Sequence, residues 1–136
     1  MNFISNFNWR PTLSGIALSL LLATGCAQRH NTLSEQEIAD GWELLFDGKT
    51  LDAWKDYNGD SLTMPWRAVD GCIQAHGDGS DLSGYIVTRK QYENFILDWD
   101  WKLSYGGNSG MLYHVVEDPY FKVPYVTGPE YQLIDG

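Results

Sequence analysis

Basic residues are scarce in this sequence. Nine lysines and arginines stand against 18 aspartates and glutamates among 136 residues, which gives a formal net charge of −9. A nucleic-acid-binding surface needs clustered lysine and arginine side chains, and the chain has no such cluster. We therefore expect no nucleic-acid partner. The acidic balance is typical of a domain that binds neutral or cationic ligands or Ca²⁺.

Cysteine is nearly absent, since the chain contains only Cys26 and Cys72. Cys26 ends the run "LSGIALSLLLATGC", which follows Arg10. The apolar part of this run has the length of a signal peptide and is too short for an ordinary membrane span. The small residues at 23–25 resemble a bacterial lipobox, although Ala23 stands where leucine is usual.

This pattern predicts a signal peptide over residues 1–25 and lipidation of Cys26. The protein would then be exported and anchored by its N-terminal lipid in the cell envelope, facing the periplasm or on the outer membrane. The alternative is an ordinary secretory signal with an incidental cysteine. If Cys26 is acylated, Cys72 has no partner for an intrachain disulfide, and we expect Cys72 to be a small buried side chain.

Familiar catalytic motifs are also missing. The chain has no G-x-S-x-G nucleophile turn, no P-loop, no H-E-x-x-H zinc motif and no paired C-x-x-C. The sequence therefore contains no motif typical of a serine hydrolase, a nucleotide-binding enzyme or a zinc site.

The rest of the chain predicts a polar tether at residues 26–33 and a domain at 34–136. Ser34 and Glu37 form a capping-box signature for one short helix that ends at Gly41. From there on, short apolar segments alternate with turn signals, which is typical of an antiparallel all-β sandwich. "VDGC" predicts a two-residue hairpin turn. The predicted strands are 43–46, 66–69, 72–75, 85–88, 95–103, 110–116 and 130–134.

The strand predicted over 95–103 alternates most clearly. Phe95, Leu97, Trp99, Trp101 and Leu103 share one face, and the residues between them are polar except Ile96. One face is therefore expected in the core. The polar face, with Asp98, Asp100 and Lys102, lines either a groove or the solvent-exposed surface.

Four separated motifs resemble the 3-keto-disaccharide hydrolase domain family, over about Asp40 to Gly136. They are "GWELLFDGKTLDAWKDY", "WRAVDGCIQA", "GYIVTRKQYENFILDWDWKLSYGGNSGMLYHV" and "GPEYQLID". The resemblance implies a concanavalin-like (laminin-G-like) jelly-roll sandwich and an exported lipoprotein of glycan-degrading bacteria. Domains of this family continue past "GPEYQLID", so the resemblance also implies that this chain is the N-terminal part of a longer domain.

The resemblance implies cleavage of a 3-keto glycoside. The hydrogen at C2 of such a sugar is acidified by the C3 ketone, so a base can remove it and the C1 substituent can leave. This route needs a base, a group that stabilises the enolate oxygen, and an acid for the leaving group. An ordinary glycosidase instead needs two carboxylates about 5–5.5 Å or about 6.5–9.5 Å apart.

The candidate catalytic residues are Glu130 and His114. In "PEYQLID", Glu130 and Gln132 share one strand face and would grip one sugar ring together; the alternative is a solvated acidic edge. Histidine can act as an acid and as a base, which makes His114 a candidate, although a lone histidine in an apolar run is more often structural. Asn108, in "GGNSG", would bind sugar hydroxyls or an enolate at a strand entrance, or else bond locally within a bulged turn.

The predicted substrate-binding residues are Asn108, Gln132, Asp135 and Lys102. No cofactor is required by the sequence, although acidic loops at 47–52 and 78–81 would suit Ca²⁺ if they bind a metal. Tryptophans 42, 54, 66, 99 and 101 are expected mostly in the core. One of them, or Tyr120 or Tyr125, would stack on a sugar.

Two main functions remain open from the sequence. The first is an envelope enzyme that cleaves oxidised disaccharides or glycosides, and the second is a non-catalytic carbohydrate-binding module on the same fold. A purely structural lipoprotein is disfavoured by the polar residues placed on otherwise alternating strands.

Overall fold

The computed structural model describes the backbone of residues 2–4 and, with side chains, residues 30–75 and 84–135. These residues form the helix α1 (Glu35–Ala39), the 3₁₀ turn η1 (Pro124–Val126) and short strands. The strands are β1 (Asn2–Ile4), β2 (Trp42–Leu44), β3 (Trp54–Asp56), β4 (Trp66–Val69), β5 (Cys72–Ala75), β6 (Ile86–Thr88), β7 (Ile96–Asp98), β8 (Asn108–Leu112) and β9 (Glu130–Ile134).

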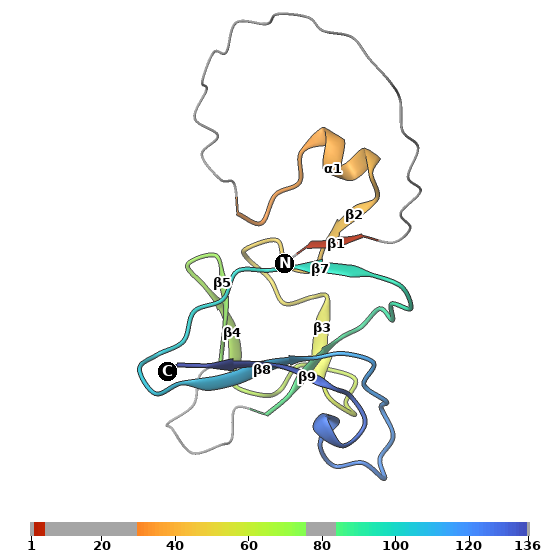
Figure 1. Ribbon diagram of the computed structural model, residues 1–136, viewed down its shortest axis with the longest axis vertical. Helices are drawn as coiled ribbons and strands as arrows, with labels where there is room; N and C mark the ends of the chain where they lie inside the picture. The colour runs from red at the N-terminus through yellow and green to blue at the C-terminus, as the bar shows by residue number, and fades with distance from the viewer. Residues whose placement is uncertain (1, 5–29, 76–83, 136) are drawn as a thin grey trace, which may run out of the picture.

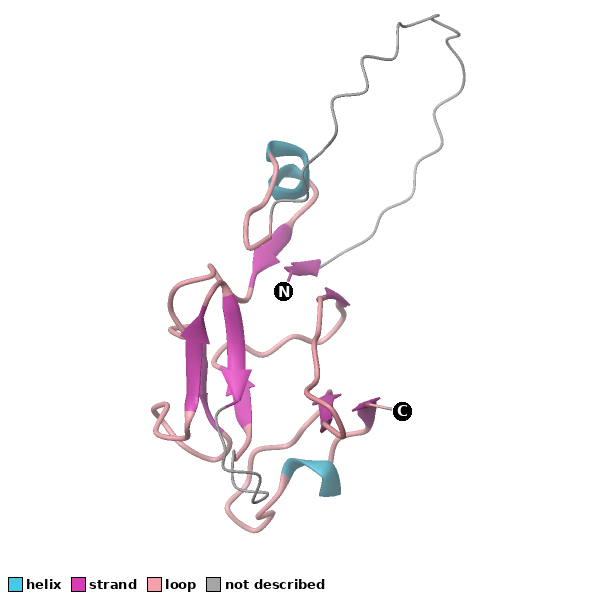
Figure 2. Ribbon diagram, turned by 90° about the vertical axis from the view of Figure 1, so that its left-hand side faces the viewer, coloured by secondary structure: helices cyan, strands magenta, loops and turns pink. Residues whose placement is uncertain are grey.

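All strand pairs are antiparallel and they form four small sheets, which confirms the predicted all-β class. The sheets have the orders β2-β1-β7, β3-β6, β4-β5 and β8-β9. Figure 1 shows α1 and β2 at one end of the molecule, and the β8–β9 ribbon running across the direction of the β4–β5 hairpin. The view in Figure 2 agrees, because the strands beside the C-terminus are seen end-on there. A closed jelly roll stays a prediction.

The capping box at the start of α1 is confirmed. The Ser34 hydroxyl accepts the Glu37 backbone N–H at 3.2 Å, and the Glu37 carboxylate accepts the Ser34 backbone N–H at 2.7 Å. Gly41 follows the last turn with a φ of 87°, in the left-handed region that glycine adopts most easily. The local sequence therefore predicted both ends of this five-residue helix.

The β4–β5 hairpin has the predicted bounds, and its turn is of the predicted kind. Asp70 and Gly71 have φ angles of 50° and 73°, the two positive values of a type I′ turn. The expectation that Cys72 is buried is wrong, because its side chain is exposed. Ile73 packs against the core instead, and neighbouring residues of a strand project to opposite faces.

Two strands lie where the sequence predicted none. β3 contains Trp54 and Asp56, which are both buried, and the inward-facing carboxylate of Asp56 hid the usual alternation of apolar and polar residues. β1 pairs with both β2 and β7, although its residues fall within the predicted signal peptide. The remainder of that prediction, including the site at Cys26, lies outside the described residues, as do residues 26–29 of the predicted tether.

Four predicted strands have different bounds in the structure. β2 and β6 differ by one or two residues at an end, and β7 and β8 differ more. β7 stops at Asp98, and the alternation of burial stops soon after it: Trp99 is partly buried, but Trp101, predicted on the same face, is 55% exposed. β8 begins at Asn108 and ends at Leu112, not at Val116. The turn before β8 is closed by the Gly107 N–H, which donates to the Ser104 carbonyl at 2.8 Å.

The core is small and centres on Leu45 and Trp54. Partly buried side chains from β5, β6, β7 and the flanking loops pack against this pair, and the Trp54 indole N–H donates to the Leu45 carbonyl at 2.7 Å. Leu133 of β9 is also buried, at 7% exposure. Within the described ranges, none of the helices is both long and apolar enough to cross a membrane.

Candidate functional site

The β8–β9 ribbon brings three of the predicted site residues onto one face. Its register pairs Asn108 with Ile134, Gly110 with Gln132, and Leu112 with Glu130. Directly opposed residues of an antiparallel pair project to the same side, so Asn108, Glu130 and Gln132 share a face. The other face carries the buried Leu133. The shared face is therefore the outer one, and we call these three residues the Asn–Glu–Gln cluster.

The two amides of this cluster are bonded to each other across the strands. The Gln132 Nε2 group donates to the Asn108 Oδ1 at 2.5 Å and to the Ser109 carbonyl at 2.9 Å. The Ser109 carbonyl can only accept, so the nitrogen of Gln132 must point toward β8. Asn108 then turns its own nitrogen away, and the pair presents one donor, Asn108 Nδ2, and one acceptor, Gln132 Oε1.

The Glu130 carboxylate lies beside this amide pair and is exposed. Within the described part of the chain, it accepts no hydrogen bond and forms no ion pair. Its side chain leans diagonally across the ribbon, over the backbone of Gly110, and not straight across toward Leu112. The cluster thus places a carboxylate, an amide donor and an amide acceptor on one solvent-facing surface.

His114 lies beyond the end of β8 and does not continue its alternation. Its φ of 53° is in the left-handed region, so the predicted strand through Val116 is wrong. The ring is exposed and lies near two other rings, with centroids 6.0 Å from Phe95 and 5.6 Å from Tyr113. His114 still follows the strand end that faces Glu130, because Leu112 pairs with that residue.

The remaining predicted binding residues lie elsewhere. Asp135 accepts the Gly106 N–H through Oδ2 at 2.7 Å and donates its own N–H to the Gly107 carbonyl at 3.0 Å. Its carboxylate therefore stabilises the turn before β8. Lys102 is exposed in the segment between β7 and that turn, and Asp98 and Asp100 of the same stretch are exposed as well. The structure does not bring Lys102 into the cluster.

A long loop leaves the ribbon beside Glu130 and is firmly anchored. Its base is closed by the Tyr113 N–H, which donates to the Pro129 carbonyl at 3.1 Å. The Glu117 carboxylate accepts the Lys55 ammonium and the Asn58 N–H, each at 2.9 Å. The Asn58 amide also donates to two backbone carbonyls of the loop, at 3.0 and 2.8 Å. These contacts hold the loop to the end of β3 and the turn that follows it.

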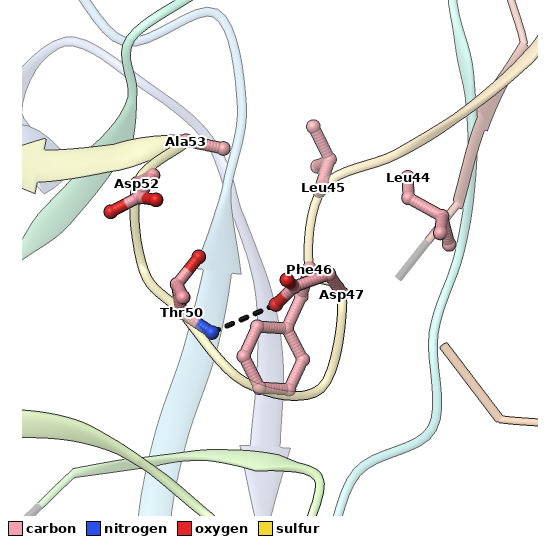
Figure 3. Close-up of a pocket in the computed structure, with 7 residues that line it drawn as sticks. All are labelled: Leu44, Leu45, Phe46, Asp47, Thr50, Asp52 and Ala53. Carbon is pink, nitrogen blue, oxygen red and sulfur yellow. Dashed lines mark hydrogen bonds between the residues drawn. The ribbon is translucent and has the colours of Figure 1, made fainter. Parts of the chain in front are cut away.

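A separate depression is lined by residues of the 44–53 segment and by none of the predicted catalytic or substrate-binding residues (Figure 3). Its Asp47 Oδ1 accepts the backbone N–H groups of Thr50 and Lys49, both at 2.8 Å, and these bonds lower the pKa of the Asp47 carboxyl. Among the described residues, no group of three potential metal-ligating side chains is found. The described loop at 47–52 therefore holds no such group, and the loop at 78–81 lies outside the described residues.

The profile of the 3-keto-alpha-glucoside-1,2-lyase-like domain matches residues 41–136. The chain belongs to this family. It is 34% identical over 111 residues to a 3-keto-disaccharide hydrolase of Bacteroides thetaiotaomicron, covering 72% of this chain and 38% of that protein. It also resembles a crystal structure at 1.70 Å of a candidate glycosyl hydrolase from Parabacteroides distasonis, with a TM-score of 0.69 and 50% identity.

The chain spans less than half of the length of either of these two proteins: it covers 47% of the solved structure and 38% of the curated protein. The Asn–Glu–Gln cluster lies within the matched range, in the strands β8 and β9. All three residues of the cluster were predicted from the sequence as site residues. Gly110 was not, because its only sequence signal was a glycine within a strand.

Proposed function

We propose that this chain carries part of the active site of an enzyme that cleaves 3-keto-disaccharides or related oxidised glycosides. The observation that supports this most directly is the exposed carboxylate of Glu130, to which no described residue donates a hydrogen bond. It lies beside an amide pair whose orientation is set by hydrogen bonds. A carboxylate that has no structural partner is available to a ligand, and oriented amides suit sugar hydroxyls.

In this proposal Glu130 is the general base. Its carboxylate removes the proton at C2 of the 3-keto ring, and the electrons of that C–H bond form the enolate between C2 and C3. Asn108 Nδ2 is the donor of the cluster that points outward, so it is placed to stabilise the enolate oxygen. Gln132 Oε1 accepts from a neighbouring hydroxyl and orients the ring.

Departure of the C1 substituent then gives a C1–C2 double bond conjugated with the ketone. We assign His114 the protonation of the departing oxygen, because it follows the strand end that faces Glu130. Water then adds: its oxygen bonds to C1 and its proton passes to His114, which restores the acid. The Glu130 carboxyl, whose proton has exchanged with solvent, protonates C2. The products are the aglycone and the free 3-keto sugar, and no oxidant or reductant is consumed.

A carbohydrate-binding module is the second candidate function, and the exposed aromatic rings favour it. Tyr120 and Tyr125 of the anchored loop are 83% and 57% exposed, and Trp101 is 55% exposed. Such rings would stack on sugar faces without any need for a base. The location proposed with either function is the cell envelope, with lipidation at Cys26 and a jelly-roll domain.

The test is to incubate the purified protein with 3-keto-trehalose and with trehalose, and to measure released monosaccharide. We expect cleavage of the keto sugar only, and a loss of roughly 10²–10⁴-fold in kcat for Glu130→Gln. Glu93→Gln, which alters an exposed glutamate in the loop before β7, should keep the wild-type rate. In D₂O the product should carry deuterium at C2, whereas direct hydrolysis would leave C2 unlabelled.

Three outcomes would contradict parts of this proposal. A Glu130→Gln variant with the wild-type rate would remove Glu130 as the base. An unlabelled C2 would overturn the elimination route. Binding of sugars without cleavage of either substrate would leave the carbohydrate-binding module as the function.

A further inference from the structure

Gly110 lies in the middle of β8, where a glycine normally weakens a strand. Backbone conformation does not explain it, since Gly110 is not among the residues with positive φ. The side chain packed against this position explains why it is a glycine. A Cβ atom at this position would lie 2.5 Å from Glu130 Cδ and 2.6 Å from Glu130 Cγ, and nearer still to Oε1. The space above Gly110 is therefore occupied by the Glu130 side chain.

The strand register explains how the two residues meet. Gly110 is directly opposite Gln132, whereas Glu130 is opposite Leu112, two positions along β8. Glu130 therefore reaches Gly110 along a diagonal of the ribbon, a distance that long side chains can span. This diagonal carries the carboxylate toward Gln132 and Asn108 and completes the Asn–Glu–Gln cluster.

Other glycines of the same region have a different role. A Cβ at Gly107 would collide with the Ser104 carbonyl oxygen at 2.7 Å, and a Cβ at Gly128 with the Tyr113 carbonyl oxygen at 2.7 Å. Substitution there would displace backbone. At Gly110 the three nearest atoms all belong to the Glu130 side chain, which is flexible, so a methyl group would displace that side chain and leave the strand pairing intact.

We propose that Gly110 is a positioning residue: its missing side chain leaves the space in which the Glu130 carboxylate lies beside the Asn108–Gln132 amide pair. This inference rests on the proposed function of Glu130. In this proposal Gly110 itself does not contact the substrate. Its effect on catalysis passes entirely through the direction in which the Glu130 side chain leans.

The test compares Gly110→Ala with wild type in the cleavage of 3-keto-trehalose. A displacement of about 1 Å at a reacting group can cost about 10²-fold in rate, so we expect kcat to fall by roughly 10–100-fold. KM should change little, because the amide pair is retained. The melting temperature should stay within about 3 °C of wild type, because only an exposed side chain moves.

Gly59→Ala is the matched control, since it makes the same change away from the cluster. A Cβ at Gly59 would meet Asp56 Cβ at 3.2 Å, a contact that small shifts relieve, and kcat should match wild type. The decisive comparison uses Glu130→Gln, with and without Gly110→Ala. If Gly110 acts through Glu130, the second substitution should lower the remaining rate by less than about twofold.

A Gly110→Ala kcat within about twofold of wild type would overturn the inference, as would an equally large loss in the Glu130→Gln background. If the wild type does not cleave the keto sugar, the proposed function fails for that substrate. A crystal structure of Gly110→Ala then decides the positioning role separately. A carboxylate in its original place would contradict it, and a displaced carboxylate would support it.

Discussion

Asp56 and Glu130 are both carboxylates on short antiparallel strands, yet they are used in opposite ways. Asp56 is 7% exposed and accepts three hydrogen bonds, from the Thr63 hydroxyl at 2.5 Å, the Thr63 N–H at 2.8 Å and the Met64 N–H at 3.2 Å. Glu130 is exposed and, among the described residues, has no bonding partner. The difference separates a carboxylate that stabilises the fold from one that is available to a ligand.

The protonation of Asp56 follows from its contacts. Burial alone would raise the pKa of its carboxyl, because a charge is costly away from water. The bonds from the Thr63 hydroxyl, the Thr63 N–H and the Met64 N–H outweigh this effect, so the pKa is lowered from its ordinary value. Asp56 therefore stays charged in the folded protein and holds the turn after β3.

The largest effect on stability is expected from Asp56→Ala. It leaves three donors of the turn without their acceptor, and we expect the free energy of unfolding to fall by about 3 kcal/mol. Urea unfolding followed by tryptophan fluorescence measures this. Asp60→Ala, an exposed carboxylate in the same turn, should change it by less than about 0.5 kcal/mol. Equal losses in the two variants would mean that burial does not distinguish these carboxylates.

The contribution of Asp56 should also depend on pH. Because its folded pKa is lowered, its stabilisation is present above the unfolded value of about 3.9 and is lost as the pH falls through the folded pKa. The stability difference between wild type and Asp56→Asn should therefore be constant from about pH 7 to pH 5 and shrink below about pH 4. A difference that stays constant down to pH 2.5 would contradict the assigned hydrogen bonds.

The smallest effect on stability is expected at the site itself. Glu130→Gln removes a charge that forms no hydrogen bond or ion pair with a described residue, so the free energy of unfolding should stay within about 0.5 kcal/mol of wild type. The same variant is expected to lose most of its activity. This combination would complete the contrast with Asp56. A loss of stability above about 1 kcal/mol would show that Glu130 is part of the folding scaffold.

Local sequence predicted the local structure well. The capping box of α1, the Asp-Gly turn between β4 and β5, and the bounds of β9 were all predicted from a few neighbouring residues. These features depend on backbone preferences and hydrogen bonds within one or two turns. Predictions failed where contacts between distant segments decide the structure. β3 was not predicted because it has a buried carboxylate, and β8 was predicted too long because it ends two residues before His114.

The candidate site shows the same division. The period of two along "PEYQLID" placed Glu130 and Gln132 on one face from sequence alone. That period does not say which face meets solvent, nor which strand lies opposite. Asn108 joined the other two residues only through the register of β8 against β9, and Asp135 proved to stabilise a turn.

By itself, the sequence determined the all-β class, the family motifs and the residue types of the site, because these follow from short-range patterns. The tertiary structure decided which carboxylate is buried and which is exposed. It also decided that the Glu130 side chain lies over Gly110, a contact between residues 20 positions apart in the chain. The physical reason is that strand pairing across long separations sets burial and clearance, and neither is encoded in any one segment.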